Sequence, residues 1–410
     1  MLLRRGVLWT VSAQVAAVAS LMVTTKIRKI FRDRDVVTLP VTPPRAHAIG
    51  DGTTATTYTY GAVLFEDMLE AIGNAQDRIL LETYIMKGDD TGKRFKEALV
   101  AAAARGVSVH MIYDGFANLV VPRSFFDLPG VETMKYPVLS SWQFFNLRRI
   151  GRDHRKILVV DETVAFVGGY NIGDDYATEW RDTHLRVEGP AVWDLDNAFI
   201  DFWNAPRRAL LRRARTPRQL PPRGTAGWQP QIRAHRNVPR QLIFPIRGMY
   251  LEAIDRAHKS IDITTAYFIP DPDILTAILQ ARQRGVVVRI LVPLVSNHVV
   301  PDWLSRGFYG TLLRAGVQIH RYTDHMVHAK TATIDGEWTT IGTANIDRLS
   351  LTGNYEINLE ILDPGLAAGM QQVFEDDCIR SEQLTYADWN SRPIVSRVYE
   401  LILKPLGPLL

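Results

Sequence analysis

Hydrophobic positions near the start of the chain recur first at helical spacing and then as a short continuous run. Within residues 61–78, Leu64, Met68 and Ile72 fall on one helical face, and the apolar run 79–86 has the length of a buried strand. A second helix and strand are expected at 93–106 and 107–113, and the same order returns at 251–260, 261–269, 273–285 and 286–292. This alternation predicts an α/β sheet in each half of the chain.

The expected helix ends carry their usual signals. Asp271 and Pro272 supply an N-cap and a first-turn proline for the helix at 273–285. Two helices end at an Arg-Gly-Val sequence, with the glycine at Gly106 in the first half and at Gly285 in the second. The two halves therefore share local signals as well as the order of elements.

A set of polar residues occurs twice, at a constant offset of 174 residues. The repeated members are an imidazole, an ammonium, an amide and carboxylates rather than apolar core positions, so the repeat indicates duplicated chemistry and two half-sites that face each other. The first copy consists of His154, Lys156, Asp161, Gly168, Asn171 and Asp182, and the second of His328, Lys330, Asp335, Gly342, Asn345 and Glu356.

Each copy contains the parts of half a phosphate pocket. The histidine and lysine are two residues apart, so both point to the same face of an extended strand. A second apolar strand follows, and then a turn in which glycines allow the backbone close to a ligand and an asparagine can donate an amide hydrogen bond. At the position after the first turn glycine, the first half has Gly169 and the second half has Thr343.

Two such halves place two imidazoles around one phosphorus, an arrangement suited to phosphodiester chemistry. Lysines and amides would stabilise the phosphoryl oxygens, while one imidazole attacks phosphorus and the other protonates the leaving alkoxide. Asp182 and Glu356, each 28 residues after the histidine of its own motif, are the expected orienting carboxylates. A metal site is the competing interpretation, because His325 and His328 are three residues apart. A lysine beside each histidine argues against it, so no metal or other cofactor is expected.

The segments HRKILVVDETVAFVGGYN and HAKTATIDGEWTTIGTAN resemble the two His-x-Lys-x4-Asp motifs of the phospholipase D superfamily. The flanking segments WRDTHLRVEGPAV, TTAYFIPD and NIDRLSLTGNYEINLEI narrow the resemblance to bacterial cardiolipin synthases. The resemblance covers the chain from about residue 58 to residue 392. It implies two α/β domains related by a pseudo-twofold axis with one active site at their interface.

The resemblance also implies a reaction and roles for individual residues. The expected activity is phosphatidyl transfer between two phosphatidylglycerols, with release of glycerol, a phosphohistidine intermediate and no metal. By the same resemblance His154 is the expected nucleophile and His328 the acid. Asp161 and Asp335 belong to the catalytic motif, although their position beyond a strand favours a structural role. Further expected site residues are Lys156 and Lys330, with Asn171, Asn345, Thr343 and Gly169 as phosphate-binding positions.

Charge and proline mark the boundary between the halves. The chain carries a net charge of +4, and no Asp or Glu occurs between Phe202 and Leu251, where eleven arginines gather. This stretch is expected to be either a solvated linker or a phosphate-binding surface. The predicted organisation is an N-terminal hydrophobic segment (1–35), a first phospholipase D-like domain (45–205), an Arg/Pro-rich linker (206–240), a second such domain (241–395) and an apolar C-terminal tail (396–410).

The N-terminal segment predicts contact with a membrane. Residues 6–25 carry no charge and are long enough to cross a bilayer, although Ser12, Gln14 and Ser20 make the segment only moderately apolar. A single span is the favoured interpretation, with a cleaved signal peptide or a surface helix as alternatives. Because more positive charge follows the segment than precedes it, the catalytic domains are expected on the cytoplasmic side of the cell membrane.

Two other functions of the same fold remain open from the sequence. A phospholipase D would use water as the acceptor and release phosphatidic acid, and the catalytic residues do not distinguish it from a synthase. A nucleic-acid phosphodiesterase would use the arginine-rich stretch, but Trp142, Phe144 and Phe145 lie in an apolar segment better suited to acyl chains, so nucleic acid is not an expected partner. Phospholipid, with phosphatidylglycerol as the favoured substrate, and the membrane are the expected partners.

Overall fold

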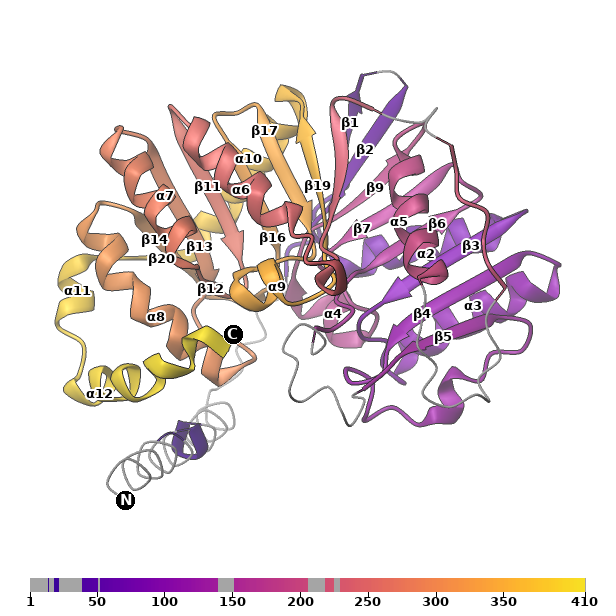
Figure 1. The fold of residues 1–410 in the computed structure, drawn as a ribbon, viewed down its shortest axis with the longest axis horizontal. Helices are drawn as coiled ribbons and strands as arrows, with labels where there is room; N and C mark the ends of the chain where they lie inside the picture. Colours follow the sequence, from indigo (N-terminus) through magenta and orange to yellow (C-terminus); the bar gives the residue numbers. More distant parts are fainter. Residues whose placement is uncertain are drawn as a thin grey trace.

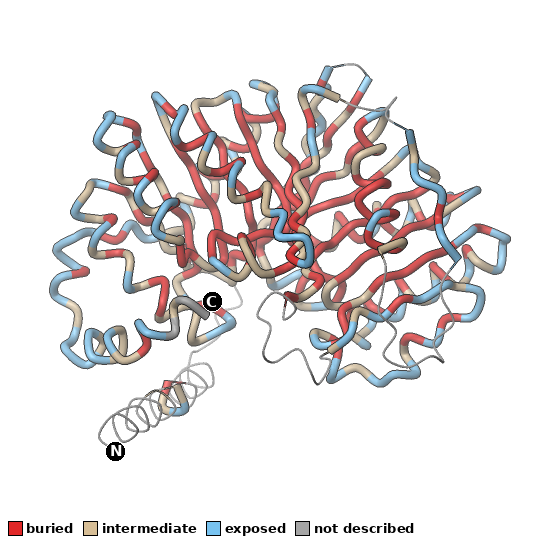
Figure 2. Tube along the Cα trace, viewed as in Figure 1, coloured by how far each residue is buried: buried red, intermediate tan, exposed pale blue. Residues whose placement is uncertain are grey.

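Two eight-stranded mixed sheets stand side by side in the computed structural model (Figure 1) and confirm the predicted α/β class. Helices flank both sheets, and the buried residues follow the strands through the middle of the molecule (Figure 2). The structure describes residues 14, 18–21, 39–50, 52–138, 151–205, 218–224 and 229–409.

The first sheet is built from the N-terminal half of the chain. Strands β3, β4 and β5 are parallel, and the remaining pairs are antiparallel. In spatial order the strands are β1 (Arg45–Ile49), β2 (Thr53–Tyr58), β9 (His184–Glu188), β7 (Val164–Gly168), β6 (Ile157–Val160), β3 (Arg78–Thr83), β4 (Ser108–Asp114) and β5 (Glu132–Tyr136). The helices are α2 (Gly61–Asn74), α3 (Asp90–Ala104), α4 (Asp174–Thr178), α5 (Val192–Asn204) and the 3-10 turn η1 (Arg123–Phe126).

The second sheet repeats this order in the C-terminal half. The order β10-β19-β17-β16-β11-β13-β14 matches β2-β9-β7-β6-β3-β4-β5, and β20 extends its far edge. The strands are β10 (Ile232–Arg236), β19 (Ile357–Leu362), β17 (Trp338–Gly342), β16 (Lys330–Ile334), β11 (Ser260–Thr265), β13 (Val287–Pro293), β14 (Gln318–Tyr322) and β20 (Ser381–Leu384). The helices are α6 (Pro245–Arg256), α7 (Pro272–Gln283), α8 (Val299–Arg314), α9 (Arg348–Thr352), α10 (Pro364–Ile379), α11 (Tyr386–Asn390) and α12 (Ile394–Leu403), with 3-10 turns η4 (Pro239–Gln241) and η5 (Lys404–Leu409).

Local signals in the sequence explain where several elements begin and end. The Asp271 carboxylate accepts hydrogen bonds from the backbone N–H groups of Asp273 and Ile274, as expected for the N-cap of α7. Gly106 and Gly285 follow their helices with φ of 96° and 90°, a conformation that favours glycine. The Arg-Gly-Val sequence is therefore a helix stop in both halves.

The two halves share a core and are joined by two short strand pairings. β7 contacts β17, and a single apolar cluster contains side chains from both sheets, including Val167, Leu185, Ile341 and Leu359. The strands β8 (Trp180–Arg181) and β15 (Met326–Val327) pair in parallel across the boundary. An isolated bridge between Asp153 and Tyr355 forms the matching contact. Backbone hydrogen bonds thus fix the relative position of the halves beside both histidines.

The expected N-terminal membrane span is contradicted. Among the residues that the structure describes, no helix is long and apolar enough to cross a membrane, and most of the segment 6–25 lies outside them. Two polar side chains of the segment instead contact the C-terminal helix: Gln14 Nε2 donates to the Ile402 carbonyl at 3.3 Å, and the Ser20 and Tyr399 hydroxyls are 3.0 Å apart. The orientation inferred from the charges around a span loses its basis.

Two other predicted segments are only partly described. Residues 139–150, with Trp142, Phe144 and Phe145, lie outside the described residues, as do 206–217 and 225–228 of the arginine-rich stretch. Within the expected linker range of 206–240, the residues Ile232–Arg236 form β10, an edge strand of the second sheet. Arg236 pairs there with Asp201 at 2.6 Å, so this arginine supports the packing of the halves.

Candidate active site

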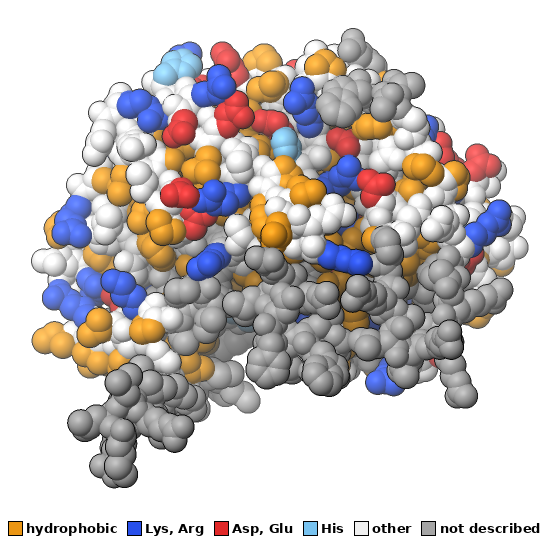
Figure 3. All heavy atoms as spheres, in the orientation of Figure 1, with side chains coloured by type: hydrophobic (Ala, Val, Ile, Leu, Met, Phe, Trp, Pro, Cys, Tyr) orange, Lys and Arg blue, Asp and Glu red, His pale blue; other side chains and the backbone are white. Residues whose placement is uncertain are grey.

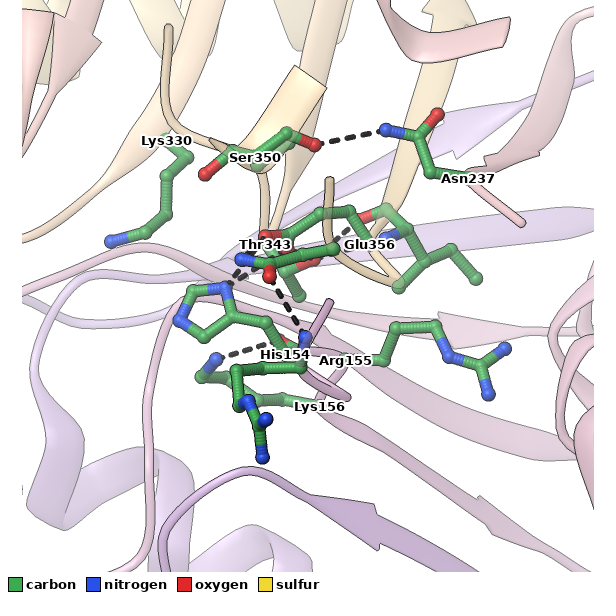
Figure 4. Close-up of polar contacts among 12 residues, drawn as sticks. His154, Arg155, Lys156, Asn237, Lys330, Thr343, Ser350 and Glu356 are labelled. Carbon is green, nitrogen blue, oxygen red and sulfur yellow. Dashed lines mark hydrogen bonds and ion pairs between the residues drawn. The ribbon is translucent and has the colours of Figure 1, made fainter. Parts of the chain in front are cut away.

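The two motif histidines lie at the boundary between the sheets. His154 precedes β6 and His328 precedes β16, which are equivalent strands of the two sheets. The Lys156 ammonium donates to the carbonyl of His154 at 2.8 Å, and the Lys330 ammonium makes the same bond to His328. Figure 4 shows Lys156 and Lys330 approaching the His154 ring from different halves. Each lysine is therefore held beside the imidazole of its own motif.

The orienting carboxylate of each histidine comes from the opposite half. His154 Nδ1 lies 2.9 Å from Glu356 Oε2, and His328 Nδ1 lies 2.6 Å from Asp182 Oδ2. This differs from the pairing within each motif that the sequence suggests. The strand pairings at the boundary explain the exchange, because Val327 is in register with Arg181 and the bridge joins Asp153 to Tyr355. The residues that follow these pairs also face each other, His328 opposite Asp182 and His154 opposite Glu356.

Burial sets the protonation of both imidazoles. The His154 side chain is 12 % exposed and that of His328 is 6 % exposed, while both carboxylates are fully buried. Burial, with help from nearby lysines, lowers the pKa of His154 well below its usual value and that of His328 to about 3. Both rings are neutral near pH 7, and a neutral imidazole that donates Nδ1–H to a carboxylate has a nucleophilic Nε2.

The two carboxylates differ in their charge near neutral pH. Burial raises the pKa of Glu356 to about 7. Burial acts in the same direction on Asp182, but Lys330 and His328 outweigh it and hold the pKa of Asp182 below its usual value. Burial also lowers the pKa of Lys156 to about 7 and that of Lys330 to about 8. The two half-sites thus have similar geometry and different electrostatics.

Thr343 and Gly169 account for part of this difference. Thr343 is fully buried, and its hydroxyl donates to Glu356 Oε2 at 2.6 Å while it accepts from the Ile357 N–H at 2.9 Å. Its hydroxyl is therefore bonded to the carboxylate that pairs with His154, and its expected contact with phosphate stays a prediction. At Gly169 a Cβ would lie 2.0 Å from Asp182 Oδ1, so glycine makes room for the carboxylate.

The two asparagines follow the second strand of each motif. The side-chain oxygen of Asn171 accepts from the Ile85 N–H at 3.2 Å, and the Asn171 side chain also hydrogen-bonds the Tyr176 hydroxyl. Asn345 is 4 % exposed, and its side-chain oxygen has no hydrogen-bond partner among the described residues. Both residues lie two positions after Gly169 and Thr343, at equivalent places in the two halves.

The motif aspartates lie away from this site and serve as caps for strands. Asp161 accepts hydrogen bonds from the backbone N–H groups of Gln76, Asp77 and Arg78, at the start of β3. Asp335 accepts from His258, Lys259 and Ser260 in the same way at the start of β11. Both residues have positive φ, 49° and 57°. They bind the turn after the motif strand to its neighbour, which agrees with the structural role favoured by their spacing.

Other residues around the histidines had not been singled out from the sequence. The Tyr84 ring lies edge-on to His154, with ring centres 4.6 Å apart, and Trp180 lies edge-on to His328 at 5.1 Å. Arg155 points away from the pocket and binds Glu82 and Asp153 in a fully buried network. The alternation of a strand predicts that Arg155 faces away from His154 and Lys156, and Glu82 in an otherwise apolar strand signalled a buried partner.

Chemically, the site brings together two neutral imidazoles, two lysines and two carboxylates at the boundary between the halves. Within the described part of the chain, no group of three or more His, Cys, Asp or Glu side chains is placed to hold a metal ion. Each site histidine has one carboxylate partner and a lysine of its own motif close by, and of these groups the lysine ammonium can donate to an anion.

Comparison with known families gives one consistent result. The family described as "Cardiolipin synthase, PLD-like domain" matches residues 68–203 and 250–378, which hold both copies of the motif. The chain is 34 % identical over 367 residues to the major cardiolipin synthase ClsA of Bacillus subtilis, covering 86 % of this chain and 74 % of that protein. It is 35 % identical over 367 residues to cardiolipin synthase 2 of Staphylococcus epidermidis, covering 87 % and 74 %.

A solved structure supports the fold independently. The chain is similar to phosphatidylserine synthase of Haemophilus influenzae with a TM-score of 0.66 and 17 % sequence identity, covering 90 % of this chain and 97 % of that one. At this identity the comparison concerns the fold alone. The arrangement of two mixed sheets is therefore shared well beyond the sequences that can be aligned with confidence.

Proposed function

Because the chain belongs to the cardiolipin synthase family with phospholipase D-like domains, we propose that it joins two phosphatidylglycerol molecules into cardiolipin and releases glycerol. The exchange of carboxylates between the halves carries this proposal: His154 pairs with Glu356, and His328 pairs with Asp182. Each histidine needs the other half, so the two motifs act as one site on one phosphodiester. The halves would be related by an approximate twofold axis through this site.

In the first step, His154 Nε2 attacks the phosphorus of one phosphatidylglycerol. A bond forms between Nε2 and phosphorus, and the bond from phosphorus to the glycerol oxygen breaks. His328 donates a proton to that oxygen, so glycerol leaves and a phosphatidyl group remains on His154. The pKa of His328 is low in the unliganded site. A phosphodiester anion placed beside the ring raises this pKa, so His328 takes up a proton from water when the substrate binds and gives that proton to glycerol.

In the second step, the glycerol head group of another phosphatidylglycerol is the acceptor. Its hydroxyl oxygen attacks phosphorus while neutral His328 takes the hydroxyl proton, and the bond between phosphorus and His154 breaks. Cardiolipin forms, and both imidazoles return to their starting protonation. The same imidazole thus serves as acid and then as base, as a two-step displacement requires.

Lys156, Lys330, Asn171 and Asn345 would stabilise the charge on the phosphoryl oxygens. Both ammonium groups come from strands next to the histidines and are buried, so a bound phosphate would meet them with little screening by water. The two amides lie at equivalent places on the two halves. Fixed donors of this kind favour the transition state, in which negative charge is greatest on these oxygens.

The asymmetry of the carboxylates supports the order of roles. Asp182 is ionised at neutral pH and makes the shorter contact, 2.6 Å, so it stabilises a protonated His328. Glu356 holds His154 through contacts of 2.9 and 3.0 Å and has a pKa of about 7. A neutral His154 is therefore favoured as nucleophile, and His328 as acid and base.

Product analysis with labelled phosphatidylglycerol in detergent micelles tests the proposal. Wild-type protein is expected to form cardiolipin and glycerol. With a phosphatidyl ester of p-nitrophenol, whose leaving group needs no proton, His328→Ala is expected to accumulate an acid-labile phosphatidyl-histidine that His154→Ala does not form. Phosphatidic acid as the main product would replace the proposal with a phospholipase D. Label trapped on His154→Ala protein would reverse the assignment of the two histidines.

A further inference from the structure

The C-terminal helix α12 has one packed face and one exposed apolar face. Its exposed side carries Ile394, Val395, Val398 and Leu401, which are 76, 65, 48 and 72 % exposed. Its opposite side packs on α8: Leu403 is fully buried, and the Tyr399 ring lies 5.5 Å from Trp303. Figure 3 shows hydrophobic side chains gathered at the lower left, where Figure 1 places this helix. The packed face already stabilises α12, so the exposed row is an additional feature.

Packing contacts connect α12 to the active site. Leu403 belongs to a small apolar cluster that includes Ile269 of β12 (Phe268–Ile269). β12 pairs with β18 (Ile346–Asp347), which directly follows Asn345. The turn η5, which continues from α12, contacts α9, the helix that follows β18. The exposed row of α12 therefore lies on an element that is connected to the second half-site through Leu403, β12 and β18.

A second exposed apolar group borders the first half-site. The loop after β4 carries Phe116, Leu119 and Val120, which are 50, 60 and 92 % exposed. In the same loop, Asn118 Nδ2 donates to the carbonyl of Tyr84 at 2.8 Å, and Tyr84 contacts the His154 ring. The loop is thus fixed beside the nucleophile, with its apolar side chains directed to solvent.

The charges on and just after α12 are suited to binding an anionic lipid surface. Arg397 and Lys404 are exposed on and just after α12, beside the apolar row. The acidic residue of the helix, Glu400, is held by Arg392 at 2.7 Å, so its charge is compensated within the protein. An amphipathic helix with apolar residues on one side and cations beside them binds anionic lipid interfaces.

We propose that α12 and the loop 116–120 form one docking face for the surface of an anionic phospholipid bilayer, and that this face brings the opening of the active site against its substrate. The inference rests on the proposed function, because it takes the substrate to be a lipid held in a bilayer. Apolar side chains on both sides of the site would insert at the level of the head groups. The phosphodiester of a lipid could then reach His154 without leaving the membrane.

An environment-sensitive fluorophore tests the orientation directly. The chain has one cysteine, Cys378, so full-length Cys378→Ser protein can carry a single label at Val398→Cys, at Val120→Cys or, as a matched control, at Ile379→Cys, which is 83 % exposed on α10. With vesicles of phosphatidylcholine and phosphatidylglycerol, the labels at 398 and 120 are expected to shift to shorter wavelength, and the label at 379 is not. No shift at 398 and 120, or an equal shift at all three positions, would overturn the docking face.

A second measurement separates this inference from the proposed activity. The variant Ile394→Gln, Val395→Gln, Val398→Gln and Leu401→Gln is expected to lose at least about 100-fold in turnover on vesicles, because it removes the apolar surface whose burial would hold the protein at the bilayer. In detergent micelles, where substrate reaches the site without a bilayer, the variant should match wild type. Equal vesicle activity would overturn the inference, whereas wild-type protein inactive in both systems would overturn the proposed function alone.

A second copy of the chain is the other possible occupant of this face. Sedimentation without lipid distinguishes a partner subunit from the bilayer. If wild type were a dimer, the four-residue variant were a monomer and vesicles left the 398 label unchanged, a second copy of the chain would replace the bilayer as the occupant. A wild type and variant of the same mass, together with the fluorescence shift, would support the bilayer.

The charges beside the apolar row give a further test. The two substitutions Arg397→Glu and Lys404→Glu should weaken binding to phosphatidylglycerol vesicles about fivefold per residue at low salt.

Discussion

Glu356 of the second half lies 2.9 Å from Nδ1 of His154 in the first half. The equivalent contact runs the other way, from Asp182 to His328. Neither half therefore supplies the carboxylate partner of its own histidine. Under the proposed function this relationship makes the two motifs one site, and the carboxylates are as informative to mutate as the histidines.

Replacing Glu356 by glutamine should abolish most of the activity. The amide can present its NH2 group to His154 Nδ1, which favours the wrong tautomer, and a loss of about 10³- to 10⁴-fold in kcat is expected. Turnover of phosphatidylglycerol in micelles measures the effect. Glu360→Gln is the matched control, because Glu360 binds His235 at 2.8 Å away from the site. Near wild-type activity of Glu356→Gln would contradict an orienting role.

Thr343 should act through Glu356. Thr343→Val removes a hydrogen bond to a carboxylate, and a loss of about 10- to 100-fold in kcat/KM is expected, while Thr343→Ser should retain most activity. The Thr343 hydroxyl lowers the pKa of Glu356, so its loss should also move the acid limb of the rate profile to higher pH. Thr339→Val is the control, since the Thr339 hydroxyl is buried with no partner among the described residues. An unchanged acid limb would argue for a purely structural Thr343.

Gly169 should not tolerate a side chain. The Cβ of Gly169→Ala would lie 2.0 Å from Asp182 Oδ1 and displace this carboxylate from His328, which should cost at least about 100-fold in kcat. Gly73→Ala in α2 is the comparison, because a Cβ there meets no atom within 4 Å, and it should leave activity unchanged. Equal activity of the two variants would show that Asp182 can move without consequence.

The rate is expected to depend on pH as a bell. Activity requires ionised Glu356 together with protonated Lys156 and Lys330, and the pKa values of these three groups are about 7, 7 and 8, so kcat/KM should fall on either side of a narrow optimum near pH 7. Lys156→Arg keeps the positive charge at high pH and should move the alkaline limb upward, whatever its effect on the maximum. An alkaline limb that stays in place would assign it to another group, such as Lys330.

The motif aspartates should contribute to stability rather than to catalysis. Asp335→Asn replaces an oxygen that accepts from the His258 N–H, so the free energy of unfolding should fall by about 1–3 kcal/mol at pH 7 with kcat nearly unchanged. The pKa of Asp335 is lowered in the folded protein by the backbone N–H groups, despite partial burial. The contribution of Asp335 to the free energy of unfolding is therefore present above the unfolded pKa of about 3.9. It is lost as pH falls through the lower pKa of the folded state.

Denaturation of Asp335→Asn and wild type at pH 7 and in acid checks this prediction, and the difference should shrink in acid. Asp161→Asn is the equivalent change in the first half and should behave alike. A large loss of activity without a loss of stability would return the aspartates to the catalytic machinery.

The sequence by itself determined the fold class and the residue types that make up the candidate site. Hydrophobic spacing predicts the alternation of helices and strands, and helix ends follow from local signals such as Asp271 and Gly285. The repeated polar residues identify an imidazole, a lysine and an amide in each half. These conclusions need only neighbouring residues, because spacing along a strand or helix sets which side chains share a face.

Only the tertiary structure decided which groups meet. Sequence distance pairs Asp182 with His154, whereas the strand pairing between β8 and β15 brings Asp182 to His328. The same contacts assign Thr343 to a carboxylate rather than to phosphate. The N-terminal segment shows the limit most clearly: its composition predicted a membrane span, yet Gln14 and Ser20 bind the C-terminal helix. Long-range partners depend on how the two sheets dock, and this information is distributed over both cores rather than held in any one motif.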